Sequence, residues 1–224
     1  MKLSEGYLLD LMVRMAHHST AIEGNSLTLG ETKSILVDNY IPRAMNMREL
    51  HEVLNFKAFV TFLQEKIEHK TPLSLDIIKS IHAILCKEAI EYVPGQFKQR
   101  PNMVVGAGFT PTTPYLVPTA LQDWLLNNET QLKFAASDQE KILAICRQHI
   151  AFEHIHPFPD GNGRVGRAIM VYDCLLADMP PVVIPVGRKA EYINFLNTED
   201  INGFALFAAE LQNIERERMM NDFN

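Results

Sequence analysis

Cysteine is scarce in this chain of 224 residues, and its distribution excludes one class of protein. The three cysteines are odd in number and widely separated, at Cys86, Cys146 and Cys174. Small extracellular domains that depend on disulfides carry paired cysteines at close spacing. Each cysteine here also lies within a helical pattern of apolar residues. We therefore expect a reduced, cytoplasmic protein.

Long apolar runs and an excess of positive charge are also missing. No apolar run approaches the ~18 residues of a membrane span, and the N-terminus lacks the order of a signal peptide. The 21 Lys and Arg residues face 27 Asp and Glu residues, a formal net charge of −6. We therefore expect neither a membrane nor a nucleic acid as partner. The length and the 47% hydrophobic content suit one full globular core.

Apolar residues recur at helical spacing along most of the chain, which predicts an all-α fold. Thr28 with Glu31, and Ser137 with Glu140, form the Ser/Thr-x-x-Glu pattern that opens helices. Asn46 and Ser74 are further candidate N-caps. The expected helices cover about 4–23, 28–39, 46–68, 74–89, 137–155, 164–176, 189–196 and 200–220. A further helix is expected to start near Pro118, with an apolar stripe of Leu121, Trp124 and Leu125.

Residues 93–118 break this pattern. They contain five prolines and several threonines around a short apolar run of Met103, Val104, Val105 and Gly106. Turn residues on both sides of such a run favour a β-hairpin or an extended flap. We expect one small β-hairpin here, in an otherwise helical bundle.

The most informative stretch runs from His156 to Arg167, with the sequence HPFPDGNGRVGR. Its prolines oppose a helix, whereas the apolar spacing after Arg164 predicts one. Gly161 and Gly163 permit backbone angles that let successive N–H groups surround an anion at the helix N-terminus. Arg164 and Arg167 lie three apart on one face, at a helix end where the dipole disfavours cations. A bound anion such as a polyphosphate explains this arrangement.

Two other residues of this stretch suit phosphate transfer. Asp160 is a hard oxygen ligand beside the expected anion site, as Mg²⁺ prefers. His156 can act as a general base at neutral pH. The alternative is a glycine-rich loop with solvated arginines and a structural histidine. The ordered set of residues favours the functional interpretation.

The string His-x-Phe-x-Asp-Gly-Asn-Gly-Arg-x-x-Arg matches the Fic family motif without a departure, and the chain resembles that family. Fic proteins are mostly ATP-dependent protein adenylyltransferases, which move AMP onto a hydroxyl of a target protein. The resemblance implies that His156 deprotonates the hydroxyl of a Ser, Thr or Tyr and that Asp160 holds Mg²⁺. It also implies phosphate contacts from the loop amides, the remaining site residues being Gly161, Asn162, Gly163, Arg164 and Arg167.

The resemblance extends over about residues 8–215. Residues 95–98 and 103–106 resemble the family's flap, which holds a target segment beside the site by strand addition. Lys98 stands where the family usually has Arg, and Pro101 removes one donor from the flap. Tyr192 and Asn197 fall where Fic proteins contact adenine or ribose.

Glu23 occupies an unfavourable place, because it ends a predicted helix whose C-terminal dipole is already negative. It is either a solvated surface residue or the partner of a distant cation. Ser19-x-x-x-Glu23-Gly24 resembles the inhibitory helix motif of Fic proteins. That resemblance implies that Glu23 pairs with Arg167 and takes the place of the ATP γ-phosphate. It divides the chain into an inhibitory segment, 1–45, packed on a catalytic core, 46–224.

Other interpretations remain open at this point. Glu23 could orient a water that removes AMP from a modified protein, and a non-catalytic nucleotide-sensing module is a further alternative. A metal site built from Cys146, His149, His154 and His156 lacks a closed four-ligand spacing. The target protein and a homo-oligomeric state cannot be read from the sequence.

Overall fold

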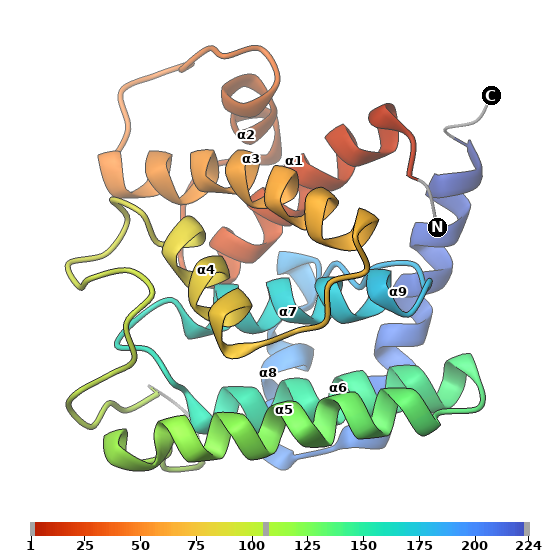
Figure 1. Cartoon of the computed structure of the whole chain (residues 1–224). Helices are drawn as coiled ribbons and strands as arrows, with labels where there is room; N and C mark the ends of the chain where they lie inside the picture. Colours follow the sequence, from red (N-terminus) through yellow and green to blue (C-terminus); the bar gives the residue numbers. More distant parts are fainter. Residues whose placement is uncertain (1–2, 105–107, 222–224) are drawn as a thin grey trace.

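The computed structural model describes residues 3–104 and 108–221, and most of this length is helical (Figure 1). This confirms the all-α class. Among the described residues no helix is long and apolar enough to cross a membrane. The elements are α1 (Glu5–Ile22), α2 (Leu29–Leu36), α3 (Met47–Glu68), α4 (Leu75–Leu85), the 3-10 turn η1 (Pro114–Leu116), α5 (Val117–Phe134), α6 (Asp138–Ile155), α7 (Asn162–Leu176), the 3-10 turn η2 (Val186–Arg188), α8 (Lys189–Thr198) and α9 (Ile201–Asn221).

The predicted helix starts are confirmed by their capping hydrogen bonds. The hydroxyl of Thr28 accepts from the backbone N–H of Glu31, whose side chain accepts from the Thr28 N–H in return. The side chains of Asn46, Ser74 and Ser137 cap α3, α4 and α6. These local bonds satisfy N–H groups that a helix cannot pair internally, so sequence alone locates them well.

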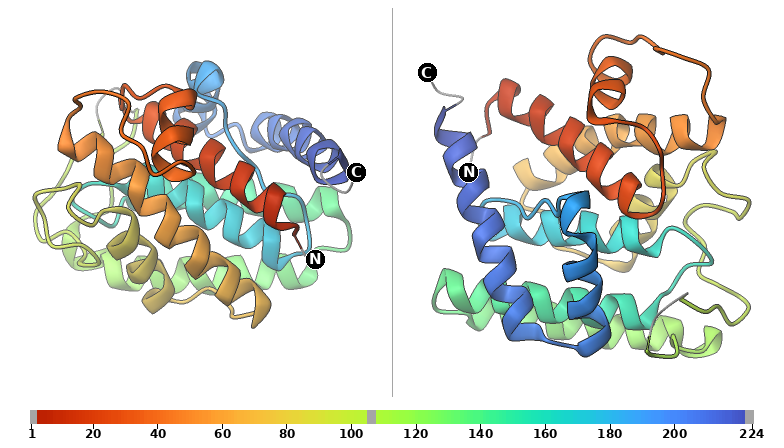
Figure 2. Two further views of the ribbon diagram at one scale, coloured as in Figure 1. Left: turned by 90° about the horizontal axis from the view of Figure 1, so that it is seen from above. Right: turned by 180° about the vertical axis from the view of Figure 1, so that it is seen from behind.

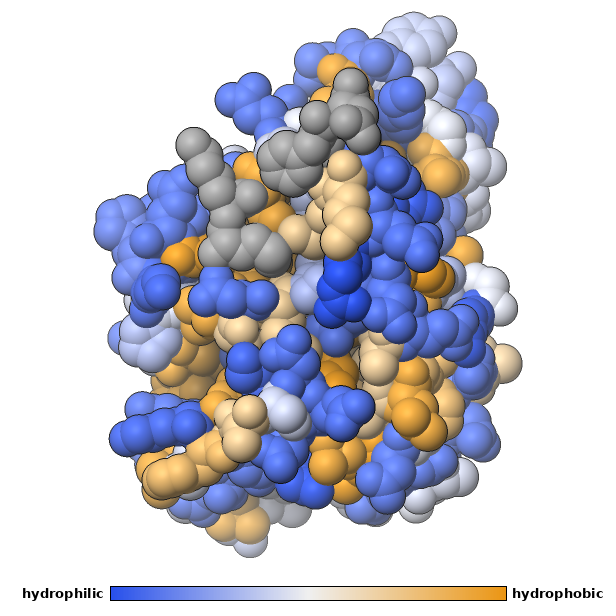
Figure 3. Space-filling model, turned by 90° about the vertical axis from the view of Figure 1, so that its right-hand side faces the viewer, coloured by the Kyte–Doolittle hydropathy of each residue, from blue (hydrophilic) through white to orange (hydrophobic). Residues whose placement is uncertain are grey.

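Helix α7 runs through the middle of the molecule, between α1 and α3 on one side and α5 and α6 on the other (Figures 1 and 2). Every residue from Arg164 to Leu175 is buried. One hydrophobic cluster joins α7 to α1, α3 and α4, and a second joins it to α6, α8 and α9. Because both clusters include residues of α7, apolar packing holds this helix in place on two sides. The face of the molecule seen in Figure 3 mixes hydrophilic residues with separate apolar patches.

Helix α1 is attached to α9 by a buried ion pair. Arg14 Nη2 donates to Glu215 Oε2 at 2.9 Å, and the Tyr7 hydroxyl donates to the same oxygen at 2.7 Å. A second bond joins Arg14 Nη1 to Glu215 Oε1. Residues of α1 and α2 also belong to the first hydrophobic cluster. The N-terminal segment therefore packs on the rest of the chain through apolar and ionic contacts.

The predicted β-hairpin is wrong for the described part of 93–118, which contains turns, bends, irregular backbone, the 3-10 turn η1 and the start of α5, but no strand. Val105 and Gly106 lie outside the described residues, whereas Met103 is 89% exposed. The backbone N–H of Lys98 donates to Pro157 O at 2.9 Å, and that of Thr112 donates to His154 O at 3.2 Å. The two sides of the segment, here called its arms, therefore bond to α6 and the loop after it instead of to each other. The prolines also remove N–H donors that strand pairing would need.

Candidate functional site

The loop from His156 to Gly161 connects α6 to α7 through two left-handed residues. His156 caps α6 with φ of 49°, and Gly161 precedes α7 with φ of 79°. A Cβ at Gly161 would overlap the Sγ of Cys86 from the chain segment after α4. Glycine is therefore required at this position both by its backbone angle and by the space available. Helix α7 has no side-chain N-cap, so its first N–H groups remain available to an anion.

Asn162 fixes the shape of this loop. Its Nδ2 donates to Phe158 O at 2.8 Å, and its Oδ1 accepts from the Phe158 N–H at 2.8 Å. The side chain is buried and both of its polar atoms are used within the loop. A phosphate contact from Asn162 stays a prediction, and its backbone N–H is the group left for it.

His82 supports the loop from α4. Its Nδ1 accepts from the Gly95 N–H at 2.7 Å, so Nε2 carries the hydrogen and donates to Asp160 O at 3.1 Å. The imidazole also stacks on Phe158, with ring centroids 3.8 Å apart. Burial lowers the pKa of His82 to about 4, which keeps the ring neutral. These partners of His82 could not be read from the sequence.

His156 has the tautomer that a general base needs. Its Nδ1 lies 3.2 Å from Glu153 O, and because a carbonyl only accepts, Nδ1 carries the hydrogen. The Nε2 lone pair is therefore available for a proton. Burial lowers the pKa of His156 to about 4, so the ring is neutral at physiological pH. A neutral imidazole with a free Nε2 can accept a proton from a hydroxyl.

Lys98 connects the flap to the base of the loop. It is 3% exposed, and its Nζ donates to Asn102 Oδ1 at 2.7 Å and to Ile155 O at 3.3 Å. Asn102 in turn donates to Phe158 O at 2.9 Å. Burial lowers the pKa of Lys98 to about 8. Lysine therefore serves here as a buried hydrogen-bond donor within the flap.

Asp160 and Arg164 lie on the α3 side of the loop. The Asp160 side chain is 41% exposed, with Oδ2 3.5 Å from Arg48 Nη2 and Oδ1 3.9 Å from Arg164 Nη2. Arg164 is buried, 3.4 Å from the buried carboxylate of Glu52. Its Nε and Nη1 have no hydrogen-bond partner among the described residues. Nη1 is the atom that lies 3.4 Å from Glu52 Oε1, so the guanidinium is in an ion pair that leaves some of its hydrogen-bonding capacity unused. Such buried donors are suited to an incoming anion.

Arg167 is bonded to the end of α1. Its Nε donates to Ser19 Oγ at 3.0 Å, and its Nη2 donates to Ser19 O at 2.9 Å and to Glu23 Oε1 at 2.6 Å. A Cβ on Gly163 would overlap Glu23 Oε1, so the carboxylate lies directly against the first turn of α7. Burial raises the pKa of Glu23, but Arg167 outweighs burial and the pKa is lowered. Glu23 is therefore an ionised carboxylate that lies beside this helix end with its side chain 39% exposed. Gly24, with φ of 100°, follows it.

A buried polar group lies behind Arg167. The Tyr192 ring is 6.0 Å from Arg167 Cζ, and its hydroxyl lies 2.8 Å from His149 Nε2. Glu153 Oε1 is buried without a hydrogen-bond partner among the described residues, and burial raises the pKa of Glu153 to about 8. Asn197, by contrast, lies exposed near the end of α8. The structure thus places Tyr192 under the site and Asn197 on the surface.

The alternative metal site does not form. The described residues contain no group of three or more His, Cys, Asp or Glu placed to hold a metal ion. His149 instead contacts Tyr192, and His154 stacks on Phe109 with ring centroids 3.9 Å apart. Cys146 is buried in the second hydrophobic cluster. These four side chains therefore have separate structural environments.

Comparison with known proteins identifies sequences that this chain resembles. Residues 72–173 match the model of the Fic/DOC family. The chain is 31% identical over 202 residues to protein adenylyltransferase fic-1 of Caenorhabditis elegans, covering 87% of this chain and 38% of that protein. It is 30% identical over 200 residues to protein adenylyltransferase Fic of Drosophila willistoni, covering 87% of this chain and 39% of that protein. The chain thus spans about two fifths of these relatives.

Solved structures agree with the fold. A Fic domain containing signaling protein from Bacteroides thetaiotaomicron superposes with a TM-score of 0.83 at 20% identity, covering 95% of this chain and 88% of that one. Fic-1 from C. elegans superposes with a TM-score of 0.80 at 27% identity, covering 98% of this chain and 64% of that one. The similarity therefore includes the N-terminal helices as well as the matched residues 72–173.

Proposed function

From the match of residues 72–173 to the Fic/DOC family model, we infer that the chain belongs to this family and is a protein adenylyltransferase that Glu23 inhibits. The relatives named protein adenylyltransferase support the reaction. The observation that carries the inhibition is the 2.6 Å contact between Glu23 and Arg167. The proposed substrates are ATP and a protein with an accessible Ser, Thr or Tyr hydroxyl.

The proposed reaction begins with the hydroxyl of the target protein. Its proton passes to Nε2 of His156 while its oxygen forms a bond to the α-phosphorus of ATP. The bond between that phosphorus and the bridging oxygen to the β-phosphate breaks, and pyrophosphate leaves. The N–H groups at the start of α7 and the Arg164 donors that have no hydrogen-bond partner among the described residues would stabilise the developing negative charge. Arg167 would hold the γ-phosphate.

Asp160 is the proposed contact for Mg²⁺. Its carboxylate is 41% exposed beside the N-terminus of α7 and is not part of a buried ion pair. A single carboxylate fits this ion, because Mg²⁺ uses few protein ligands together with substrate phosphates. The ion would neutralise charge on the phosphates when bound. Arg48 and Arg164, both within 4 Å of Asp160, would balance the carboxylate in its absence.

The proposed inhibition results from competition between Glu23 and the γ-phosphate of ATP for Arg167. Glu23 Oε1 occupies the position beside Arg167 Nη2 and Gly163 that a terminal phosphate oxygen would need. ATP bound without Arg167 would leave its α-phosphate misaligned with His156, and misplacement of reacting atoms by about 1 Å can cost 10²-fold in rate. The structure therefore corresponds to the proposed inactive form. The reducing cytoplasm is the proposed location, since all three cysteines are free and buried.

The test uses purified protein with α-labelled ATP and Mg²⁺. Glu23→Gly is expected to label itself or proteins of a cell lysate, with excess GTP and CTP failing to compete. Adding His156→Ala to this variant should lower label transfer by about 10²–10⁴-fold while ATP affinity stays unchanged. Label transfer that survives the loss of His156, or labelling from γ-labelled ATP instead, would refute AMP transfer by this residue.

A further inference from the structure

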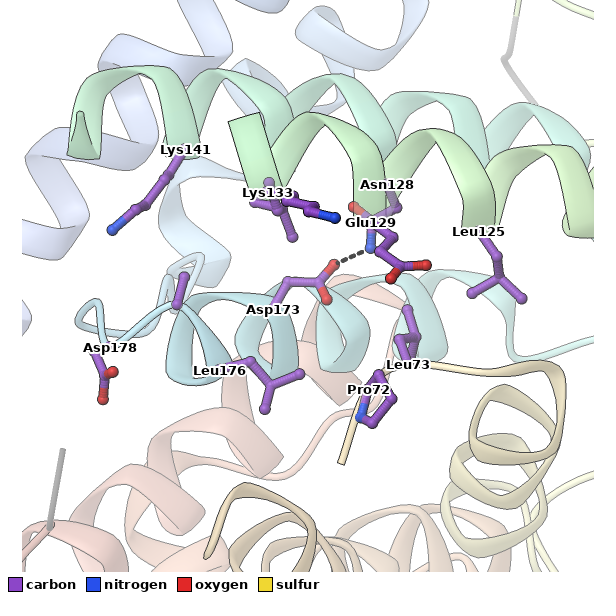
Figure 4. Close-up of a pocket in the computed structure, with 12 residues that line it drawn as sticks. Pro72, Leu73, Leu125, Asn128, Glu129, Lys133, Lys141, Asp173, Leu176 and Asp178 are labelled. Atoms are coloured by element: carbon purple, nitrogen blue, oxygen red, sulfur yellow. Dashed lines mark hydrogen bonds between the residues drawn. The ribbon is translucent and has the colours of Figure 1, made fainter. Parts of the chain in front are cut away.

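A second pocket lies between α5 and α7, away from the motif loop. Its volume is about 330 Å³, within the lower part of the range of ~300–1,000 Å³ for small-molecule sites. Apolar walls come from Leu73, Leu125, Leu132 and Leu176. Asp173 of α7 and Asn128 of α5 point toward each other between these helices (Figure 4). Gly163 and Asp173 are ten residues apart along α7, about 15 Å at the helical rise, so the two sites are separate.

The buried amide–carboxylate pair of this pocket has one acceptor atom without a hydrogen-bond partner in the part of the chain that the structure describes. Asn128 Nδ2 donates to Asp173 Oδ2 at 3.0 Å, and both residues are 3% exposed. Asn128 Oδ1 is buried without a hydrogen-bond partner among the described residues. Turning the amide over would exchange its oxygen and nitrogen and leave the nitrogen unpaired instead. An unpaired buried acceptor costs about 1–3 kcal/mol, so the pair is incomplete without another molecule.

We propose that this pocket binds a small organic cation, a primary ammonium or amidinium group on a short apolar body. The cationic group would donate hydrogen bonds to the Asp173 carboxylate and to Asn128 Oδ1, and the apolar body would contact the surrounding leucines. The same surroundings disfavour an anion, which would meet a carboxylate and a carbonyl oxygen at the floor.

The charged residues at the opening of the pocket, here called the rim, favour neither a positive nor a negative ligand. Glu129 and Lys133 of α5, Lys141 of α6 and Asp178 after α7 line the opening, and their formal charges cancel. Lys141 and Asp178 lie at one end of the opening, away from the carboxyl group of Asp173 (Figure 4). Burial raises the pKa of Asp173 to about 7, and the hydrogen bond from Asn128 opposes this rise. A bound cation would favour the ionised carboxylate.

The probe is n-butylammonium, compared with 1-butanol and butyrate at matched ionic strength, in a ¹H–¹⁵N NMR titration of the whole chain. We expect the amine to shift the amides of α5 and α7 around the pocket, with at least tenfold higher affinity than the alcohol or the acid. Affinity should rise about tenfold between pH 6 and pH 8, because Asp173 ionises with a pKa of about 7 while the amine stays charged. Tyr172 and Cys174, its titratable neighbours on α7, have pKa values raised by burial and stay neutral in this range.

Two variants distinguish binding through Asp173, inside the pocket, from binding through the charged residues at its rim. Asp173→Asn keeps the shape of the side chain and should abolish the preference for the amine. Glu129→Gln removes a carboxylate from the rim and should change amine affinity less than threefold. Equal binding of amine and alcohol by the wild type, absence of saturable shifts, or unchanged affinity in a folded Asp173→Asn variant would overturn the proposal. The wild-type comparison stands even if that variant does not fold, and it is independent of AMP transfer.

Discussion

Replacing Glu23 by glycine should convert an inactive protein into an active one, and the structure sets the size of the effect. The glutamate makes one charge-assisted hydrogen bond, to Arg167 Nη2 at 2.6 Å. The side chain of Arg167 is 7% exposed and that of Glu23 is 39% exposed. The pair is therefore intermediate between an exposed ion pair, which contributes about 0–1 kcal/mol of stability, and a fully buried one. Hydrogen bonds to charged groups contribute about 1.5–3 kcal/mol, which corresponds to roughly 10- to 150-fold in an equilibrium.

The assay is AMP transfer at equal ATP, with self-modification as one readout. Glu23→Gly should exceed the wild type by that factor, and Glu23→Gln should activate less, because it keeps the shape and loses the charge. Glu5→Gln, which removes a carboxylate from the other end of α1, is the matched control and should resemble the wild type. Arg167→Ala should not activate, since the proposed γ-phosphate contact is lost with the inhibitory one.

Two results would refute this reasoning. A wild type as active as Glu23→Gly would show that the ion pair with Arg167 does not compete with ATP. Activation by the control Glu5→Gln would assign the effect to the net charge or stability of α1. A parallel incubation of AMP-modified protein with wild type and Glu23→Gly tests the reverse direction, because removal of AMP that depends on Glu23 would assign the glutamate a role in hydrolysis.

Three further predictions concern the metal contact, the α1–α9 ion pair and a buried acid. In the Glu23→Gly background, Asp160→Ala should weaken Mg²⁺ dependence and turnover at least about tenfold, and a metal titration that overlays its parent would contradict this. Glu215→Gln removes the buried carboxylate that pairs with Arg14 and leaves Arg14 with only the more exposed carboxylate of Asp10. This variant should lower the free energy of unfolding in urea by about 1.5–3 kcal/mol, whereas exposed Glu217→Gln should change it by less than about 0.5 kcal/mol. Burial raises the pKa of Glu153 from 4.5 to about 8, so the stability from its bound proton is complete below pH 4.5 and is lost as pH rises to 8. Between pH 6 and pH 7.5, the free energy of unfolding in urea should therefore fall by about 2 kcal/mol more in the wild type than in Glu153→Gln. The same change with pH in both proteins would contradict this prediction.

Local chemistry made much of this fold predictable. Capping residues such as Thr28 and Asn46 satisfy backbone groups within three residues, so their effect does not depend on the rest of the chain. The loop before α7 was predictable for the same reason, since its prolines and glycines restrict their own backbone angles. The pairing of Glu23 with Arg167 was different. It joins residues 144 positions apart, and the family resemblance, rather than any local pattern, predicted it.

Residues that the sequence did not reveal depend on long-range packing. Glu52 lies among the apolar positions of α3, and its pairing with Arg164 needs α7 to pass beside it. Helix α7 is buried on every side, so it has no polar face from which the burial of Asp173 could be inferred. The flap was predicted as a hairpin because its local pattern favours pairing within the segment. Its arms instead use donors such as the Lys98 N–H to bond to the loop after α6.

The attachment of α1 to α9 limits how the proposed inhibition by Glu23 could be released. Arg14 and Glu215 form a buried pair, and Tyr7 donates to the same carboxylate, near the start of α1. Withdrawing Glu23 by moving the whole helix would break these bonds and expose the apolar face of α1 to water. Rotation of the Glu23 side chain about its own bonds breaks a single contact and leaves the helix in place. A physiological activator would therefore break the fewest contacts if it acted on the last turn of α1 and on Gly24. Removal of the residues before Tyr7 should leave the proposed inhibition intact.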